Sequence, residues 1–132
     1  MHAVSHALSA HFNIHHGIGN AIALPHVLRF NCAVNDEPYS RMGNRLDLRS
    51  IDNSLVGAKR LLTVTDALLA VLEMPRTVLD ISGLELDMAS IDSVKQDMVS
   101  HIMEDPCLET NVCEVREMDG EIERIITAVV GL

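Results

Sequence analysis

The fold is decided by residues His2–Asn31, HAVSHALSAHFNIHHGIGNAIALPHVLRFN, which hold six of the seven histidines of the chain. His2 and His6 are four residues apart, so on a helix they share one face. His16 follows a short connector and stands directly before Gly17, where the missing Cβ lets the backbone turn sharply and approach a ligand closely. Two imidazoles on a helix and a third on the next bend are able to surround a divalent metal, because neutral imidazole suits zinc, iron, copper and nickel.

The spacing of these histidines leaves a plainer interpretation open. Histidines at positions i and i+4 of a helix are more often ordinary surface or core residues than metal ligands. We interpret His26 as a residue packed where Pro25 disturbs its helix. We interpret His11 and His15 as solvated side chains or as the lining of a pocket mouth, and we expect His101 to be exposed.

Length and composition predict one helical domain. The chain has 132 residues, enough for a single domain that buries roughly two thirds of its unfolded surface. Hydrophobic residues make up 48% and aromatic residues only 2%, so the core must be aliphatic. Such a composition favours helix packed on helix over a β-sandwich. We therefore predict that residues 1–132 form a single all-α, bundle-like domain of five to six helices.

Charge and cysteine content exclude several classes of protein. The net charge is −9, and no basic run exceeds Lys59-Arg60, so nucleic acid is not an expected partner. The three cysteines have no C-x-x-C spacing, which speaks against a disulfide framework or a structural zinc site and favours a reducing cytoplasm. No apolar run approaches the roughly 20 residues that a membrane span needs, and no secretory signal is recognisable.

Periodicity and capping residues predict where the helices lie. Pro25 predicts a kink or two short helices that meet near Leu24. An irregular piece with a turn at Gly83 is expected between the fourth and fifth helices, and a loop is expected over 107–117. The predicted helices are His2–Asn13, Gly17–Asn31, Asp36–Leu46, Asn53–Glu73, one capped by Ser90 and ending at Glu104, and Gly120–Val130 capped by Asp119.

The first stretch resembles the C-terminal helical domain of the iron-containing alcohol dehydrogenases. That family carries a His-x-x-x-His segment, a short connector, a His-Gly-x-x-Asn-Ala segment and then a Leu-Pro-His-Val-Leu run. The matching pieces here are His2 and His6, then His16-Gly17-Ile18-Gly19-Asn20-Ala21, then Leu24-Pro25-His26-Val27-Leu28. One residue departs from the pattern: His15 stands where the family usually has proline, and we expect this to loosen the bend.

The resemblance implies roles for three histidines. It implies that His2 and His16 ligate the metal, Fe²⁺ or Zn²⁺, and that His6 lies beside the nicotinamide and the substrate as the catalytic histidine. Two weaker matches follow, at Leu72–Thr77 and at Asp105–Asn111. The family continues the second of these with Pro-Arg, whereas this chain has Val112-Cys113.

Two parts of the family pattern are expected to be missing. One is the nucleotide-binding half with its Gly-rich phosphate loop, since Gly17-x-Gly19 follows no predicted strand and is no phosphate cradle. The other is the Asp-x-x-x-His pair that supplies the two remaining metal ligands. We therefore expect a truncated domain without an NAD(P) site, and, because two imidazoles rarely hold iron or zinc firmly, a largely metal-free isolated chain.

Three functions stay open at this point. The chain is a fragment or relict of an iron-dependent NAD(P) alcohol dehydrogenase that is inactive as an isolated chain. Alternatively, it is a non-catalytic helical assembly module, or one that complements a Rossmann-type N-terminal half, or it is a metal-binding protein that uses the histidine cluster. We also expect a homodimer or higher homo-oligomer, formed through an exposed apolar patch of Ala7, Leu8, Phe12, Leu61, Leu62, Leu68 and Leu69.

Overall fold

The computed structural model describes residues 1–46, 56–111 and 120–132, and within these ranges it contains helices and no strand. The prediction of an all-α domain with five to six helices is confirmed. The α-helices are α1 (His2–Phe12), α2 (His16–Val34), α3 (Asp36–Arg45), α4 (Gly57–Val71), α5 (Ile91–Glu104) and α6 (Glu121–Val130). Two 3-10 turns lie between them, η1 (Val78–Asp80) and η2 (Pro106–Leu108).

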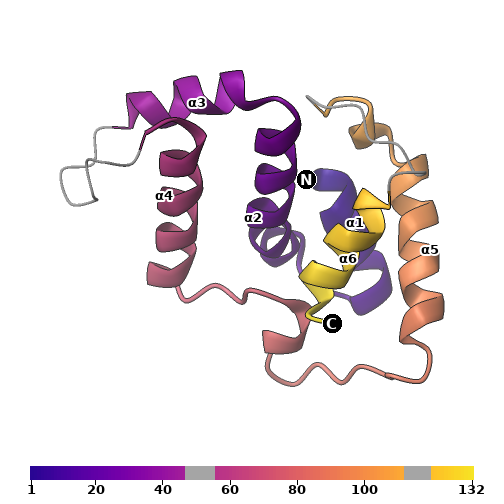
Figure 1. Cartoon of the computed structure of the whole chain (residues 1–132). Helices are drawn as coiled ribbons and strands as arrows, with labels where there is room; N and C mark the ends of the chain where they lie inside the picture. The colour runs from indigo at the N-terminus through magenta and orange to yellow at the C-terminus, as the bar shows by residue number, and fades with distance from the viewer. Residues whose placement is uncertain (47–55, 112–119) are drawn as a thin grey trace.

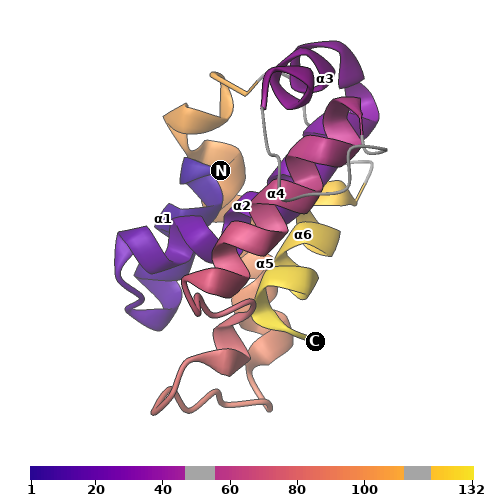
Figure 2. The same cartoon turned by 90° about the vertical axis from the view of Figure 1, so that its left-hand side faces the viewer.

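Helix α2 lies between two groups of helices (Figure 1). Helices α1, α5 and α6 pack with it around the larger hydrophobic core, and α3 and α4 pack against its C-terminal half around a smaller one. Both views place the first turn of α1 beside the segment that follows α5 (Figures 1 and 2). The beginning of the chain is thereby brought next to residues about a hundred positions later.

The larger core is aliphatic, as the composition predicts. Its fully buried large side chains are Leu8, Ile22, Val78, Met98, Ile102, Ile126, Val129 and Val130. Burying one such side chain contributes on the order of 2 kcal/mol to the stability of the fold. Helix α1 turns Ala3, Val4, Ala7 and Leu8 toward this core, so its outer face is left to carry the histidines.

Several predicted boundaries are corrected by the structure. Helix α2 continues through the buried Pro25, so the expected division into two short helices is wrong. Helix α4 begins at Gly57 because Val56 is extended, and it ends at Val71, two residues before the predicted end. The expected cap at Asp119 and most of the loop over 107–117 lie outside the described residues.

The predicted apolar patch is not exposed as a whole. Ala7, Leu8, Leu61 and Leu69 are buried within the chain, and Phe12 and Leu62 are partly buried. Only Leu68 of that set is exposed, and it lies on α4 near the exposed Val71 and Leu72. The prediction of an exposed patch was wrong because these residues are covered by neighbouring helices: α1 packs on α2 and α5, and α4 packs on α3 and α2. The homo-oligomer itself stays a prediction.

Helices α3 and α4 approach each other most closely at Gly43. A Cβ atom built on Gly43 would lie 1.9 Å from the carbonyl oxygen of Gly57 and 3.2 Å from the amide nitrogen of Leu61. These neighbours are backbone atoms at the start of α4, so they can yield only if the whole helix moves. Glycine is therefore required at this position by space, although its backbone conformation is ordinary helix.

We expect Gly43→Ala to lower the free energy of unfolding by at least about 1–3 kcal/mol, because the added methyl group overpacks the α3–α4 contact. The matched control is Met42→Ala on the same helix, where the side chain is 56% exposed and the expected change is within about 0.5 kcal/mol. Urea unfolding followed by far-ultraviolet circular dichroism measures both. Equal midpoints for the two variants would contradict this packing.

Candidate metal centre

Three histidines converge where α1 meets the beginning of α2. His2 and His6 lie one turn apart on α1, and His16 is the first residue of α2. The ring centroids are 6.2 Å apart for His2–His6, 5.4 Å for His2–His16 and 5.2 Å for His6–His16. Each ring offers one nitrogen, and these three atoms lie within 4.8 Å of one another. The histidines singled out by sequence therefore do form one cluster.

The connector between α1 and α2 is held firmly rather than loosely. Asn13 takes the left-handed conformation that ends α1, which asparagine tolerates better than most residues, and Ile14 is buried. His15 then caps α2, because its Nδ1 accepts a hydrogen bond from the amide of Gly17 at 3.2 Å. The histidine that replaces the family's proline thus caps the start of α2 with its side chain, and the loosening of the bend stays a prediction.

Gly19 and Ser5 set the distance between the two helices. A Cβ atom on Gly19 would lie 2.7 Å from Ser5 Oγ, so only glycine allows this approach. Ser5 is fully buried; its hydroxyl donates to the carbonyl oxygen of His16 at 2.9 Å and accepts from His16 Nδ1 at 3.1 Å. The sequence drew attention to Gly17, but the required glycine is Gly19.

Asp105 holds His6 from the far end of the chain. His6 Nδ1 donates to Asp105 Oδ2 at 2.7 Å, and the other oxygen, Oδ1, accepts from the amide of Cys107 at 2.7 Å. The Asp105 side chain is only 7% exposed. Burial acts to raise the pKa of Asp105, but the hydrogen bonds from His6 and Cys107 outweigh it and hold that pKa below the ordinary value. A fixed carboxylate thus orients His6.

Sequence reasoning assigned no site role to Ser5 or Asp105. Asp105 directly follows the predicted helix end at Glu104 and precedes Pro106, and an Asp-Pro pair after a helix is common without any functional role. Ser5 lies between two histidines on the opposite, buried side of α1. The weak match of the Asp105–Asn111 loop to the family was the one signal that pointed to this region.

The hydrogen bonds decide which ring nitrogens are available. Since Nδ1 of His6 and Nδ1 of His16 both donate, the neutral form of each ring presents Nε2 as an unprotonated ligand atom. Metal-binding histidines in proteins are oriented in this way, with the second nitrogen donating to a carboxylate or another oxygen. The donor set therefore fits a divalent transition metal. A second group of metal-binding residue types, His6, Asp105 and Cys107, has His6 in common with the histidine cluster.

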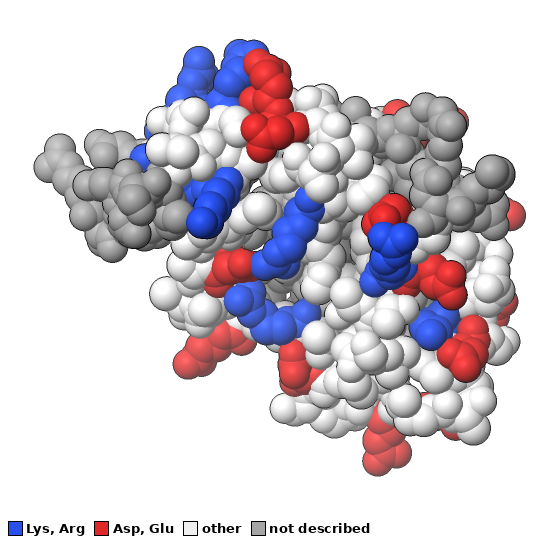
Figure 3. All heavy atoms as spheres, viewed as in Figure 1, with Lys and Arg blue, Asp and Glu red and all other residues white. Residues whose placement is uncertain are grey.

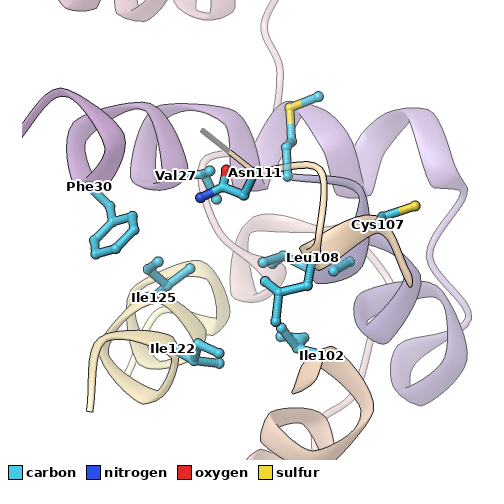
Figure 4. A pocket seen from close by; sticks show the side chains of 11 residues that line it. Val27, Phe30, Ile102, Cys107, Leu108, Asn111, Ile122 and Ile125 are labelled. Carbon is cyan, nitrogen blue, oxygen red and sulfur yellow. The ribbon is translucent and has the colours of Figure 1, made fainter. Parts of the chain in front are cut away.

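The apolar cavity beside this site is too small for a substrate. Its volume is about 30 Å³, room for one or two water molecules. It lies between α1, α2, α5, η2 and α6, and the Cys107 side chain points away from it (Figure 4). Burial raises the pKa of the Cys107 thiol, and the neighbouring Asp105 raises it further. Both effects favour the protonated thiol over the thiolate.

The charged residues around α2 and α4 form ion pairs rather than a basic patch. Asp66 on α4 lies 2.5 Å from Arg29 of α2 and 3.8 Å from Arg76. On the face shown in Figure 3, basic and acidic side chains are interspersed. His26 is half-buried beside them, and burial, then Arg29, lowers its pKa, so it stays neutral. His26 is thus half-buried in a continuous helix, not at a helix break, and its packing role stays a prediction.

Fold and site together define a helical domain with a surface cluster of three histidines, two of them oriented by hydrogen bonds. The profile of the Fe-containing alcohol dehydrogenase family, C-terminal, matches residues 1–130. The chain belongs to this family, and the resemblance seen in its sequence is confirmed.

Individual relatives match shorter stretches. The chain is 46% identical over 46 residues to the methanol:N,N-dimethyl-4-nitrosoaniline oxidoreductase of Rhodococcus erythropolis, covering 35% of this chain and 11% of the relative. It is 36% identical over 59 residues to the lactaldehyde reductase of Escherichia coli K12, covering 45% and 15%. A crystal structure of 1,3-propanediol oxidoreductase has the same fold over 95% of this chain and 31% of its own, with a TM-score of 0.72 and 21% identity.

The lowered pKa of Asp105 predicts a pH-dependent stability. A carboxyl whose pKa is lower in the folded than in the unfolded state stabilises the fold above its unfolded value, about 3.9, and this contribution is lost as pH falls through the folded pKa. We expect Asp105→Asn to destabilise the chain at pH 7, and the difference from the unmodified chain to shrink below about pH 4.

The matched control is Glu104→Gln, which removes the same charge one residue earlier at an exposed position. Chemical unfolding at pH 7, 5 and 3 measures the three chains. A difference for Asp105→Asn that is constant with pH, or that the Glu104→Gln control reproduces, would argue against the Asp105–His6 hydrogen bond.

Proposed function

We propose that this chain supplies part of the metal centre of an iron-dependent alcohol dehydrogenase that uses NAD(P). In this proposal His2 and His16 are the metal ligands, and His6 lies beside the reacting carbon of the substrate. The observation that carries it is the convergence of these three imidazoles from two helices, two of them with Nδ1 hydrogen-bonded to Ser5 or Asp105. Membership of the family adds iron as the expected metal, with zinc as the alternative.

Each residue of such a site would have its own role. Bound metal would supply a Lewis acid for the alcohol oxygen, and NAD(P) would accept the hydride. Ser5 positions the His16 ring, and Asp105 positions the His6 ring. With its Nδ1 proton held by Asp105, His6 presents Nε2 as a proton acceptor, which suits it to take the proton that the alcohol loses.

The nucleotide would have to be bound by other residues. The described parts of the chain contain no strand and no phosphate loop at a helix start, and the matched relatives and the matched structure are much longer than the aligned stretches. We propose that a Rossmann-type half, on the same or a separate polypeptide, completes the enzyme. We propose a reducing cytoplasm as its location, because the three cysteines of the chain have no C-x-x-C spacing.

Metal content and turnover test this proposal separately. The chain is loaded with Fe²⁺ under nitrogen, or with Zn²⁺, and then analysed after gel filtration, alongside His2→Ala, His16→Ala and the control His101→Ala. We expect His2→Ala and His16→Ala to lower the bound metal and the control to leave it unchanged. Unchanged metal in both site variants would refute the ligand assignment.

Turnover is measured by the formation of reduced nicotinamide with methanol or 1,3-propanediol. We expect none from the isolated chain, because it lacks a nucleotide site in its described parts. Activity of the chain alone would refute the proposal that a Rossmann-type half is needed. Activity that appears only on addition of a Rossmann-type domain of the family would support complementation.

A second candidate function, a helical assembly module, is favoured by a row of exposed apolar residues on α4. Leu68 and Val71 are 56% and 80% exposed and lie about one turn apart at the end of the helix, and Leu72, which follows the helix, is 58% exposed. We propose that two copies of the chain pair these rows across a two-fold axis, because a surface that matches itself is the simplest cover.

We expect Val71→Lys to dissociate the resulting dimer, because it places like charges opposite each other. The control is Val34→Lys, at a residue that is 57% exposed at the end of α2. Light scattering at micromolar concentration measures the mass of each. A monomer before any substitution, or a dimer that survives Val71→Lys, would refute this interface.

A further inference from the structure

A polar hollow of about 220 Å³ lies between α2, α4 and the segment that follows α4. In the space-filling view, basic side chains flank this hollow (Figure 3). It is smaller than the pockets that take drug-sized ligands, so it suits a small ion. Its lining residues are all distinct from the histidine cluster: Pro25, His26, Arg29, Asp66, Arg76 and Thr77. We propose that this hollow is a binding site for inorganic phosphate that discriminates against sulfate.

Two guanidinium groups in the hollow are joined by one carboxylate. Arg29 Nη2 lies 2.5 Å from Asp66 Oδ2, and Arg76 Nη1 lies 3.8 Å from Asp66 Oδ1. A guanidinium has several N–H donors in a planar fork, so these contacts with Asp66 leave donors of both arginines for a ligand. The arginine side chains are 48% and 45% exposed, which keeps those donors accessible. Two cations against one carboxylate leave a positive charge in the hollow, although the chain as a whole carries −9.

The backbone that carries Arg76 is held in place before any ligand arrives. Asp80 Oδ2 accepts hydrogen bonds from the amides of Arg76 and Thr77 at 3.0 and 2.8 Å, and Thr77 and Asp80 form the capping box of η1. Asp80 is not among the residues that line the hollow, so its carboxylate fixes the segment without occupying the site. Arg29 stands on the continuous helix α2. An anion that binds both arginines therefore has little backbone to order, which lowers the cost of binding.

His26 adds a hydrogen-bond acceptor to the same hollow. Burial lowers the pKa of His26 and Arg29 lowers it further, whereas a hydrogen bond with the Arg76 backbone acts in the opposite direction. A hydrogen bond that favours the protonated ring is one in which the ring donates. The second nitrogen of the neutral ring is then an acceptor. The hollow thus combines two cationic donors with two acceptors, the His26 ring and the Asp66 carboxylate.

The acceptors decide which anion fits. At pH 7 inorganic phosphate always keeps at least one O–H group, which can donate to Asp66 or His26 while its other oxygens accept from the arginines. Sulfate and simple carboxylates are fully deprotonated at this pH, so they offer no donor and Asp66 repels them. A phosphate monoester has lost most of its O–H at pH 7, because its second pKa is about 6. The carboxylate that a site for any anion would not contain therefore gives selectivity for the free phosphate ion.

Anion titrations followed by NMR test this site independently of the proposed function. The isotope-labelled full chain is kept in EDTA, so that no metal binds the anion, and chloride holds the ionic strength constant. Phosphate, sulfate and methyl phosphate are added separately at pH 7. The site variants are Arg76→Gln and Asp66→Asn. Their matched controls are Arg41→Gln and Glu37→Gln, which remove the same charges from an exposed ion pair on α3. Circular dichroism checks that each variant folds.

We expect phosphate to shift the amide signals of Arg29, Arg76 and Thr77 in a saturable way. Sulfate should bind at least about 10-fold more weakly, because it meets the Asp66 carboxylate without a proton to share. Methyl phosphate should also bind more weakly than phosphate. Arg76→Gln should weaken phosphate binding about 10-fold or more, since it removes a charged donor.

The Asp66→Asn variant gives the sharpest expected result. It removes the repelling carboxylate and adds an amide donor, so sulfate should then bind at least as tightly as phosphate does. The two α3 controls should bind each anion as the unmodified chain does. A structural role of Asp66 alone would not exchange the preference between two anions of similar size and shape.

Several results would overturn the proposal. One is the absence of a saturable shift at tens of millimolar phosphate, and another is equal binding of phosphate and sulfate by the unmodified chain. A loss in Arg41→Gln as large as that in Arg76→Gln would show attraction to positive charge in general. Methyl phosphate that binds as tightly as phosphate would refute the assignment to the free ion. If a site variant does not fold, the unmodified chain decides, because shifts centred on α3 instead of the hollow also contradict the site.

Discussion

The close approach of α1 and α2 is the constraint on which the rest of the structure depends. It exists because Gly19 has no Cβ and Ser5 fills the space with a hydroxyl. That hydroxyl bonds both the backbone and the ring of His16, so the contact that packs the helices also aims a side chain. A larger residue at either position would separate the helices and scatter the histidines at the same time. The packing of α1 on α2 and the geometry of the histidine cluster therefore depend on the same contact.

Asp105 also links helix packing to the orientation of a histidine, but between residues far apart in the sequence. It lies 99 residues from His6, and the hydrogen bond between them is possible only because α5 packs beside α1. The buried side chains of Met98 and Ile102 on α5 pack in the larger core and hold the helix in place. The Asp105 carboxylate at the end of that helix then orients the His6 ring. A substitution that disturbs this core packing would therefore change the geometry of the histidine cluster even if the histidines themselves are unchanged. The geometry of the cluster thus depends on the packing of the whole larger core.

The sequence predicted what depends on local pattern. Helical periodicity and capping residues predicted α5 and α6 close to their observed bounds, and the spacing of His2, His6 and His16 identified the cluster. It failed where tertiary contacts decide. Leucine-rich α4 has apolar residues on more than one face, so periodicity could not tell the buried Leu69 from the exposed Leu68. Asp105 could not be assigned to His6, because nothing within a local window links residues 99 positions apart.

The exposure of the cluster separates metal binding from catalysis. His2 and His16 lie at the surface of the described structure, and the His6 side chain is 41% exposed. Imidazole ligands work in such a setting because the metal–nitrogen bond does not depend on a dry environment. Hydride transfer does depend on one, since water competes for the metal and screens the charge that develops at the alcohol oxygen. In the proposed function, exposed histidines of this kind can bind a metal, whereas action on a substrate needs a further surface that covers them.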